Sequence, residues 1–380
     1  MHVLVIPTWY PNGDDKLIGI YHKEFTENLV KNKGIKANML YIDRQKISHP
    51  IKYLFSNKKE VIEEKNYKVY MRKNFDIRRL SYNLQMNNYY KCLEKAFLDY
   101  VKIEGKPDIL HAHVTLPAGY AVCKLGKKYN IKVVVTEHAT YYERFFKEEA
   151  NKKYSKFVLD NSYYTTVSNY MKDYILSFHK QCDVLPNLVD ADAFKLPRKK
   201  IKGLRLVTVV GLRKIKRVDD IIASLKMLIE EKGYKDATLT VVGDGLDKDY
   251  FVNRCNELGM KKYVKFVGKK TKKQIANILN KSNIYVMSSS LETFGIPGVE
   301  ALLSGIPVVA TKCLGPEEYV NKDNGKLIEI GNIKEMADSI DYVYKHMDNY
   351  KVSTLRNSVK RYSAKEVTKK AISIYKSLLK

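Results

Sequence analysis

The chain lacks the usual marks of a secreted, disordered or membrane-spanning protein. Its five cysteines are widely spaced, at positions 92, 123, 182, 255 and 313. This spacing argues against a disulfide framework or a zinc knuckle and favours a reducing compartment. No apolar run approaches the roughly 20 residues of a membrane span. The opening MHVLVIPTWYPNGDD lacks the basic head and cleavage site of a signal peptide. We therefore expect a soluble cytoplasmic chain.

Acidic residues are also scarce. The chain has 42 Asp and Glu residues against 68 Lys and Arg residues, a formal net charge of +26. Such an excess favours anionic partners, such as phosphorylated small molecules, nucleic acid or an acidic membrane face. A composition bias explains it as well, since the chain is also rich in Asn and Ile and carries 29 tyrosines. The charge alone leaves both explanations open.

Short apolar segments alternate with helical patterns along the 380 residues, which exceed one ordinary core. The expected strands lie at 2–8, 36–43, 108–114, 132–138, 163–168 and 182–186, and then at 204–211, 237–245, 263–268, 282–289 and 306–311. This alternation predicts an α/β fold with two doubly wound, Rossmann-like parallel-sheet domains whose strand ends bind ligands.

The break in this pattern predicts the domain boundaries. We place the first domain at 1–186, a polar, proline-bearing linker at 187–203 and the second domain at 204–359. The last segment, about 360–380, reads as a helix that packs back onto the first domain.

The stretch SSSLETFGIPGVEALLSGIPVVA, residues 288–310, predicts the start of a helix. A strand ends near Met287, Pro297 marks the first helical turn and Gly305 follows the helix end. The amides of residues 294–298 then gather at a helix N-terminus, where a phosphate binds readily.

Two glutamates flank this turn, Glu292 before it and Glu300 inside the helix. A phosphate would repel both carboxylates unless each accepts hydrogen bonds from hydroxyls beside the phosphate. A nucleotide sugar offers such hydroxyls on its ribose and on its sugar. Alternatively, Glu300 only favours the positive end of the helix dipole and Glu292 is solvated.

A second turn, in VTVVGLRKIKRVDDII, crowds basic residues between a strand and a helix. They are Arg213, Lys214, Lys216 and Arg217. Cations at a strand end suit a diphosphate whose charge grows as its bond to a sugar breaks. A solvated helix start is the alternative. The VVGDG turn at 241–245 is no dinucleotide fingerprint, because it lacks the three-glycine spacing and the later acidic residue.

Three histidines lie in expected strands of the first domain. His111 and His113 share one strand face, and we interpret both as hydrogen-bonded core residues because a third metal ligand is not near them in the sequence. His138 ends a buried strand and begins a loop, so it should face the ligand cleft. A functional and a structural role are both open for it.

Together these motifs resemble the retaining glycosyltransferases of the GT-B fold called family four, over nearly the whole chain. The similar stretches are VLVIPTWYPN, DILHAHV, TEH, VSNYMKDYI, VLPNLVDADAF, VVGDG, VKFVG and, most specifically, SSSLETFGIPGVEALLSGIPVVAT. The resemblance implies two Rossmann-like domains that face a central cleft. It also implies transfer of a sugar from a nucleotide sugar to an acceptor hydroxyl, with retention of configuration.

The resemblance assigns roles to individual residues. Glu292 looks like the glutamate near the donor sugar hydroxyls, and Glu300 like the one that holds the ribose. Arg213 and Lys216 match the basic pair that neutralises the leaving diphosphate. His138 matches the cleft histidine near the transferred sugar.

The remaining donor-binding positions are Gly19, Gly268, Thr293, Phe294, Gly295 and Ile296. The backbone of residues 293–296 looks like the clamp on the diphosphate and sugar, and Gly268 stands where members contact the base. Gly19 stands where other members carry a glycine pair near the donor phosphates. Only one glycine is present here, which leaves that contact open.

The implied chemistry is front-face attack, in which the leaving phosphate helps to take the acceptor proton. Cations and hydrogen-bond donors serve this reaction, in place of two closely set catalytic carboxylates. We expect no metal or other cofactor, because no Asp-x-Asp stands in a suitable strand-end loop. The expected partners are a nucleotide-sugar donor, with UDP favoured over GDP, and a glycan or lipid-linked acceptor of bacterial surface polysaccharide biosynthesis.

Other functions remain as alternatives. A GT-B epimerase or hydrolase would act on the donor alone, without an acceptor. A nucleic-acid-binding protein is disfavoured because no recognised nucleic-acid motif is present. Residues 46–90 mix basic and aromatic side chains, as would a segment that rests on the anionic inner face of a membrane. An acceptor-side loop without lipid contact is the alternative for this segment.

Overall fold

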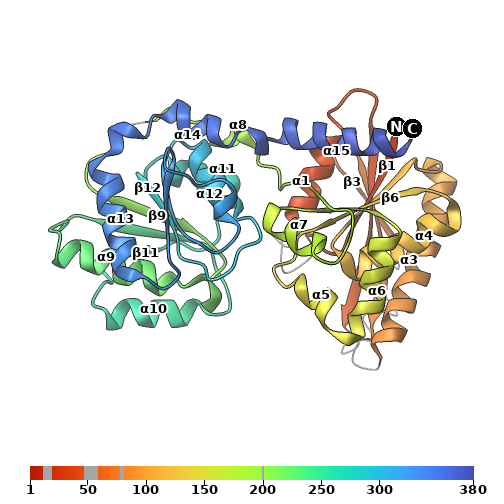
Figure 1. Ribbon diagram of the computed structural model, residues 1–380, viewed down its shortest axis with the longest axis horizontal. Coiled ribbons are helices and arrows are strands. Elements are labelled where there is room, and N and C mark those ends of the chain that lie inside the picture. Colours follow the sequence, from red (N-terminus) through yellow and green to blue (C-terminus); the bar gives the residue numbers. More distant parts are fainter. Residues whose placement is uncertain (12–18, 47–58, 78–80, 199–200) are drawn as a thin grey trace. The chain divides into compact units, whose positions relative to one another are not determined.

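The computed structural model describes residues 1–11, 19–46, 59–77, 81–198 and 201–380. Two compact units share these residues (Figure 1). Unit 1 comprises Met1–Leu188 together with Val367–Lys380, and unit 2 comprises Val189–Glu366. The segment predicted as a linker, 187–203, therefore falls mostly within unit 2, where Ala191–Phe194 forms the short helix α8.

Unit 1 is built on an eight-stranded sheet in the order β3-β4-β2-β1-β5-β6-β7-β8. The strands are β1 (His2–Pro7), β2 (Lys36–Lys46), β3 (Lys59–Glu63), β4 (Lys68–Asp76), β5 (Ile109–His113), β6 (Lys132–Glu137), β7 (Tyr163–Thr166) and β8 (Asp183–Val184). All neighbours pair in parallel except β3, which is antiparallel to β4. The central strands are apolar on both faces because helices cover both faces. Val3 to Ile6 of β1, for example, are completely buried.

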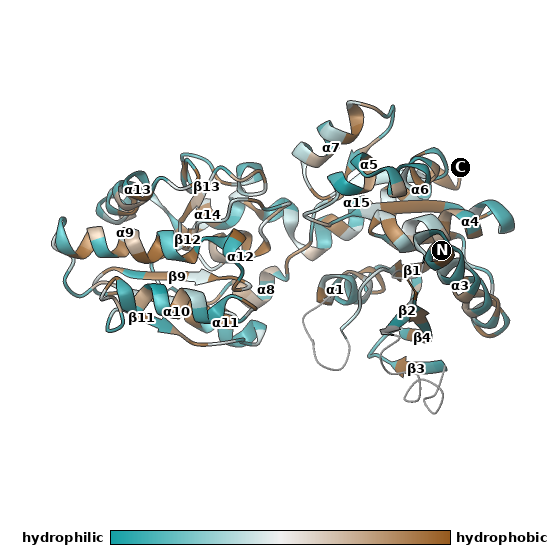
Figure 2. Cartoon of the chain, turned by 90° about the horizontal axis from the view of Figure 1, so that it is seen from below, coloured by the Kyte–Doolittle hydropathy of each residue, from teal (hydrophilic) through white to brown (hydrophobic). Residues whose placement is uncertain are grey.

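The helices of unit 1 are α1 (Ile20–Leu29), α3 (Tyr82–Glu104), α4 (Tyr120–Tyr129), α5 (Glu143–Lys147), α6 (Glu149–Asp160) and α7 (Asn169–Leu176). Figure 2 shows α1 and α3 on opposite sides of β1, β2 and β4. Helix α15 (Ala364–Leu378) contains the boundary between the units, and its larger part packs in unit 1. There its Tyr375 hydroxyl bonds the Nδ1 atom of His111 over 2.6 Å.

Unit 2 is built on a six-stranded, all-parallel sheet in the order β11-β10-β9-β12-β13-β14. The strands are β9 (Arg205–Val209), β10 (Thr238–Val242), β11 (Val264–Phe266), β12 (Ile284–Met287), β13 (Val308–Thr311) and β14 (Gly325–Ile328). The longer helices are α9 (Val218–Glu230), α10 (Lys248–Glu257), α11 (Lys272–Leu279), α12 (Ile296–Leu303), α13 (Ile333–Lys345) and α14 (Val352–Ser358).

Each sheet has one point at which the strand order reverses. In unit 1 it lies between β1 and β5, and in unit 2 between β9 and β12. The loops that follow such a strand pair diverge to opposite faces of the sheet. They leave a crevice at the carboxyl ends of the strands, which is where doubly wound folds bind ligands. These two points therefore define where a functional site is expected in each unit.

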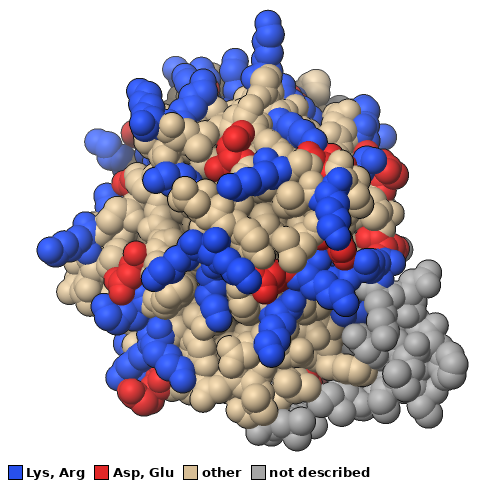
Figure 3. Space-filling model, turned by 90° about the vertical axis from the view of Figure 1, so that its right-hand side faces the viewer, with Lys and Arg blue, Asp and Glu red and all other residues tan. Residues whose placement is uncertain are grey.

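The segment 46–90 does not behave as one surface segment. Its described part includes the β3–β4 hairpin and the start of α3, and Val69, Tyr70 and Met71 of β4 are buried in the sheet. Residues 47–58 and 78–80 of the predicted membrane segment lie outside the described residues. The basic surface of unit 1 is nevertheless extensive, since Lys and Arg side chains far outnumber acidic ones on the face in Figure 3. None of the described helices is long and apolar enough to cross a membrane.

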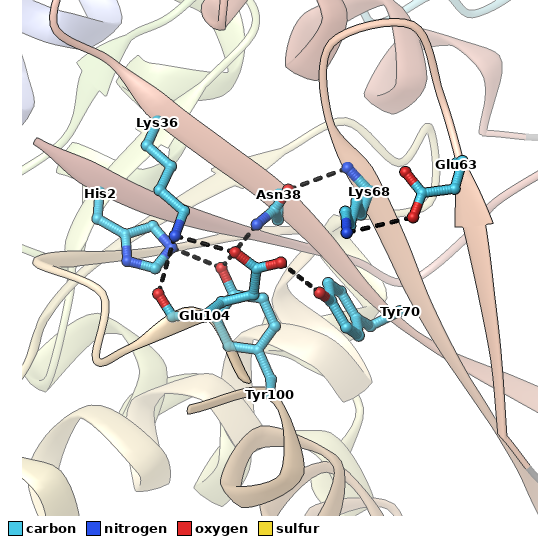
Figure 4. A network of polar contacts seen from close by, with 8 residues as sticks. All are labelled: His2, Lys36, Asn38, Glu63, Lys68, Tyr70, Tyr100 and Glu104. Atoms are coloured by element: carbon cyan, nitrogen blue, oxygen red, sulfur yellow. Dashed lines mark hydrogen bonds and ion pairs between the residues drawn. The ribbon is translucent and has the colours of Figure 1, made fainter. Parts of the chain in front are cut away.

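A polar network joins the amino ends of the unit 1 strands to the end of α3 (Figure 4). The Tyr100 hydroxyl meets His2 Nε2 at 2.5 Å and accepts a hydrogen bond from Asn38 over 3.2 Å. The Tyr70 hydroxyl donates to the Glu104 carboxylate over 2.5 Å. These bonds satisfy polar groups at the sheet edge opposite the expected crevice, so we assign them a structural role.

Candidate active site

Two polar loops meet at the reversal point of unit 2. Residues 210–217 follow β9, and residues 288–295 follow β12, its neighbour in the sheet. The loops are tied together directly. The Ser288 hydroxyl donates to the carbonyl of Lys216 over 2.8 Å, and the Ser290 amide donates to the carbonyl of Ile215 over 2.8 Å. The sequence motifs predicted separately thus form one surface.

The centre of this surface is an ion pair. Lys216 Nζ lies 2.6 Å from Glu292 Oε1, and the two side chains are only 17% and 15% exposed. The Ser289 hydroxyl donates to the same carboxylate oxygen over 2.9 Å. The Glu292 amide donates to the carbonyl of Cys313, at 2.9 Å, which fixes the backbone of the loop. A cation and a carboxylate are therefore held side by side at the strand ends.

The other basic residues of the turn differ in their surroundings. Arg213 is exposed and forms no ion pair with the described part of the chain. Lys214 lies over the Tyr250 ring, with 4.9 Å between its Nζ and the ring centroid. Arg217 pairs with Asp220 at 2.7 Å, within the start of α9. Arg213 and Lys216 are thus the cations of this turn least committed to neighbours outside the two loops.

The start of α12 is shaped by its glycines. Gly295 has φ 84°, in the left-handed region, and its carbonyl accepts a hydrogen bond from the Tyr319 hydroxyl over 2.8 Å. A Cβ atom on Gly298 would lie 2.2 Å from that hydroxyl. Phe294 is 1% exposed and packs against Tyr319. Phe294 therefore anchors the turn as a core residue and offers a ligand only its backbone.

Glu300 lies one turn into α12 and is partly exposed, as are Thr293 and Ile296 before it. The charges of both glutamates affect the phenol of Tyr285 in β12. Burial raises the pKa of Tyr285, and the nearby carboxylates of Glu292 and Glu300 raise it further. The two glutamates of the motif are thus brought to one region of unit 2.

The VVGDG turn supports this region by close packing. A Cβ atom on Gly243 would lie 1.9 Å from the carbonyl oxygen of Val210, and one on Gly245 would lie 2.3 Å from that of Leu212. Only glycine lets the β10 loop lie this close to the β9 turn. Gly268 has φ 70° and open space around it, and its carbonyl accepts the Gly243 amide at 3.0 Å.

The reversal point of unit 1 carries histidines in place of charged pairs. His138 follows β6, and both of its ring nitrogens are hydrogen bonded. Its Nε2 meets His113 Nδ1 at 2.9 Å, and its Nδ1 meets Asn187 Oδ1 at 3.0 Å. Gly19 precedes α1 with φ 69°, and a Cβ there would lie 2.4 Å from the carbonyl oxygen of Trp9.

A buried carboxylate holds the loop that carries His138. Glu137 Oε1 accepts the amides of His138 and Ala139 at 2.8 and 2.7 Å, and Oε2 accepts the amide of Thr115 at 2.8 Å. Burial raises the pKa of Glu137, and these hydrogen bonds oppose the rise. Sequence reasoning missed both Glu137 and Asn187, although they lie in the quoted stretches TEH and VLPNLVDADAF.

The prediction that His111 and His113 are both hydrogen-bonded core residues is confirmed for His111 only. Both ring nitrogens of His111 are bonded, to the hydroxyls of Tyr375 at 2.6 Å and Thr136 at 2.8 Å. His113 differs, because its buried Nε2 has no hydrogen-bond partner. Two histidines that are distant in the sequence, His22 and His138, lie beside it in the fold.

Comparisons with known proteins relate the chain to glycosyltransferases. The family model "Glycosyl transferases group 1" matches residues 192–365, and the model "Glycosyltransferase Family 4" matches residues 53–193. Among curated proteins, N-acetyl-alpha-D-glucosaminyl L-malate synthase of Bacillus anthracis is 28% identical over 61% of this chain and 64% of its own length. Glycogen synthase of Mycobacterium tuberculosis is 27% identical over 57% of this chain and 54% of its own length. The matches thus span less than two thirds of these relatives.

Solved structures resemble the chain along its whole length. Sucrose-phosphate synthase of Thermosynechococcus elongatus has a TM-score of 0.78 at 16% identity, covering 99% of this chain and 98% of its own. Anabaena Alr3699/HepE in complex with UDP has a TM-score of 0.76 at 17% identity, covering 99% of this chain and 100% of its own. At such identities the likeness establishes the fold.

Proposed function

Since the chain belongs to the group 1 and family 4 glycosyltransferases of the GT-B fold, we propose that it moves a sugar from a nucleotide-sugar donor to an acceptor hydroxyl with retention. The observation that carries this proposal is the Lys216–Glu292 pair at the reversal point of unit 2. A diphosphate needs cations at this place, and a sugar beside it needs a hydrogen-bond acceptor. The ion pair of Lys216 and Glu292 places a cation and a hydrogen-bond acceptor side by side.

In this proposal Lys216 and Arg213 neutralise the diphosphate, and the backbone of residues 293–296 contacts the phosphates and the sugar. Glu292 accepts hydrogen bonds from sugar hydroxyls, and Glu300 accepts them from the ribose. Gly268 and Gly19 lie beside the base and the phosphates. The pairing of Lys216 with Glu292 orients the lysine before the donor arrives, so little reorganisation is needed when charge develops.

The proposed reaction breaks the bond between the anomeric carbon and the phosphate oxygen. A bond to the acceptor oxygen forms on the same face of the sugar, and the acceptor proton passes to the leaving phosphate. The cations stabilise the negative charge that gathers on that phosphate. We propose that this step needs no metal ion, so a chelator should not lower the transfer rate.

His138 is proposed to lie beside the transferred sugar. Its ring nitrogens are held by His113 and Asn187, so a ring nitrogen can reach the sugar only when one of these hydrogen bonds opens. The Glu137 carboxylate, which binds the backbone amide of His138, keeps the loop in place meanwhile.

UDP is the favoured nucleotide, with GDP as the second choice. Two structural neighbours, Alr3699/HepE and TarM, are described in complexes with UDP. We propose a glycan or lipid-linked acceptor of bacterial surface polysaccharide synthesis, reached in the cytoplasm at the inner face of the membrane. The basic surface of unit 1 (Figure 3) supports the membrane part of this proposal. Absence of binding to anionic vesicles at low salt would contradict it.

A melting-temperature screen with nucleotides and nucleotide sugars tests the donor proposal. A donor well above its dissociation constant should stabilise the chain by about 2–4 kcal/mol through mass action. Incubation of that donor with candidate acceptors then tests the reaction. A glycosylated product supports transfer, whereas donor hydrolysis or epimerisation without any product from an acceptor would contradict it.

A further inference from the structure

Three histidines from separate segments converge at the reversal point of unit 1. His22 lies in the first turn of α1, His113 ends β5 and His138 follows β6. One ring nitrogen of each lies within 4.8 Å of the other two. His22 is 2% exposed and His113 is completely buried. Three imidazole rings from separate segments thus lie together in the interior of unit 1.

Two of these rings have an unsatisfied nitrogen. His22 Nδ1 and His113 Nε2 are buried and have no hydrogen-bond partner in the described chain. A buried polar atom without a partner destabilises the fold, so native proteins rarely keep one without reason. His111, two residues before His113 in β5, has both of its ring nitrogens bonded. Among the buried histidines of the described chain, the two with an unbonded nitrogen are therefore the two that belong to the cluster.

The ring positions suit one shared metal ion. The ring centroids are 4.7 Å apart for His22 and His113, 5.1 Å for His113 and His138 and 5.2 Å for His22 and His138. Tetrahedral zinc with Zn–N bonds of about 2.0–2.1 Å places imidazole centroids about 5 Å apart. Asn187 Oδ1 lies 3.0 Å from Nδ1 of His138. An N–H there would leave Nε2 of His138 as the ligand atom, in the manner of an outer partner of a metal ligand. The ion would then replace the hydrogen bond that this Nε2 shares with Nδ1 of His113 over 2.9 Å.

The donor set indicates which ion would bind. The cluster offers three imidazole nitrogens and contains no carboxylate. Neutral imidazoles favour Zn²⁺, Cu²⁺ and Ni²⁺, whereas Mg²⁺ and Ca²⁺ require oxygen ligands. Three protein ligands leave a fourth position for water.

We propose that His22, His113 and His138 form a binding site for Zn²⁺ in unit 1. The binding site itself does not depend on the proposed transfer reaction. One consequence does rest on that function: an ion that holds the His138 ring would restrain the residue proposed to lie beside the transferred sugar. Zinc would then inhibit transfer reversibly, while transfer itself still needs no metal.

The test uses the full chain after treatment with a chelator, titrated with Zn²⁺ by calorimetry and with Co²⁺ by absorption. We expect one ion per chain and a visible Co²⁺ spectrum without a thiolate charge-transfer band, because the five free cysteines lie elsewhere. His22→Gln and His113→Gln should each weaken Zn²⁺ binding by more than about 100-fold, since loss of a ligand exceeds loss of an outer partner. The exposed His346 of unit 2 provides the matched control, and His346→Gln should bind as the natural chain does.

X-ray absorption of the zinc-loaded natural chain needs no variant and should report three imidazoles. A thiolate band, fewer than three imidazoles, or cluster variants that bind Zn²⁺ as tightly as the natural chain would overturn the site. If zinc binds as expected and no nucleotide sugar is consumed, the proposed transfer fails and the metal site stands. If transfer occurs and zinc neither binds nor inhibits, the metal site fails alone.

Discussion

The two units share an architecture but fill their reversal points with different chemistry. Unit 2 places Lys216 and Glu292 there, each still partly open to solvent. Unit 1 places buried imidazoles there, and burial lowers the pKa of His138 to about 4, so this ring is neutral near pH 7. One fold thus provides a charged edge, which we propose binds a diphosphate, and a neutral edge, which we propose binds Zn²⁺.

The two reversal points differ in chemistry because their side chains are buried to different degrees. A cation and a carboxylate remain charged when water still reaches them and when each compensates the other. Isolated charges in the position of His113 would be costly, so neutral rings that share hydrogen bonds occupy it. Variants that exchange or remove these groups should therefore affect the two units in different ways.

The largest expected effect concerns the charged edge. Lys216→Ala and Glu292→Gln should each lower turnover of the nucleotide sugar at least ~100-fold, the scale of losing one transition-state contact. Lys226→Ala is the matched control, because Lys226 forms an exposed ion pair with Glu230 one helical turn away. Steady-state rates of the purified variants check this. A near-normal rate in either variant would refute the role assigned to that residue.

The second expected effect concerns Glu137, the buried carboxylate that holds the loop carrying His138. Glu137→Gln replaces an acceptor of several hydrogen bonds by an amide that cannot accept them all, so unfolding free energy should fall by about 2–3 kcal/mol. Glu149→Gln, at a side chain that is 88% exposed, should change it by less than about 0.5 kcal/mol. Urea unfolding measures both. If Glu137→Gln is as stable as Glu149→Gln, the hydrogen bonds of Glu137 contribute little to the unfolding free energy.

A smaller effect concerns pH in the metal-free chain. Burial lowers the pKa of His111 to about 3 and that of His138 to about 4. The unfolded chain therefore binds more protons below its ordinary histidine pKa of about 6.5. The contribution of these neutral histidines to the stability of the fold is therefore fully present above a pH of about 6.5 and is lost as the pH falls toward 4.

Amide exchange at pH 7 and pH 5 separates the units in this test. Unit 1 should lose protection at the lower pH more than unit 2, whose single histidine, His346, is exposed. Equal losses in both units would contradict the assignment of the buried histidines.

Much of the charged edge could be predicted from the sequence, because strand-end loops are local features. Glu292 and Lys216 each follow a recognisable strand, and parallel strands bring their ends together. Their direct ion pair could not be predicted, since it joins residues 76 positions apart. His22 was missed because it lies inside a helix, where nothing local indicates that the ring points toward β5. The β3–β4 hairpin was missed because its lysines resemble a solvated segment.

The most direct test of the division between the units is amide hydrogen exchange of the full chain with and without a nucleotide. The nucleotide should be the one that raises the melting temperature most, with UDP first. We expect protection at residues 210–217 and 288–300 of unit 2, where the two tied loops would contact the diphosphate. Bound nucleotide with protection confined to unit 1, or absent from both loops, would contradict the placement of the donor site.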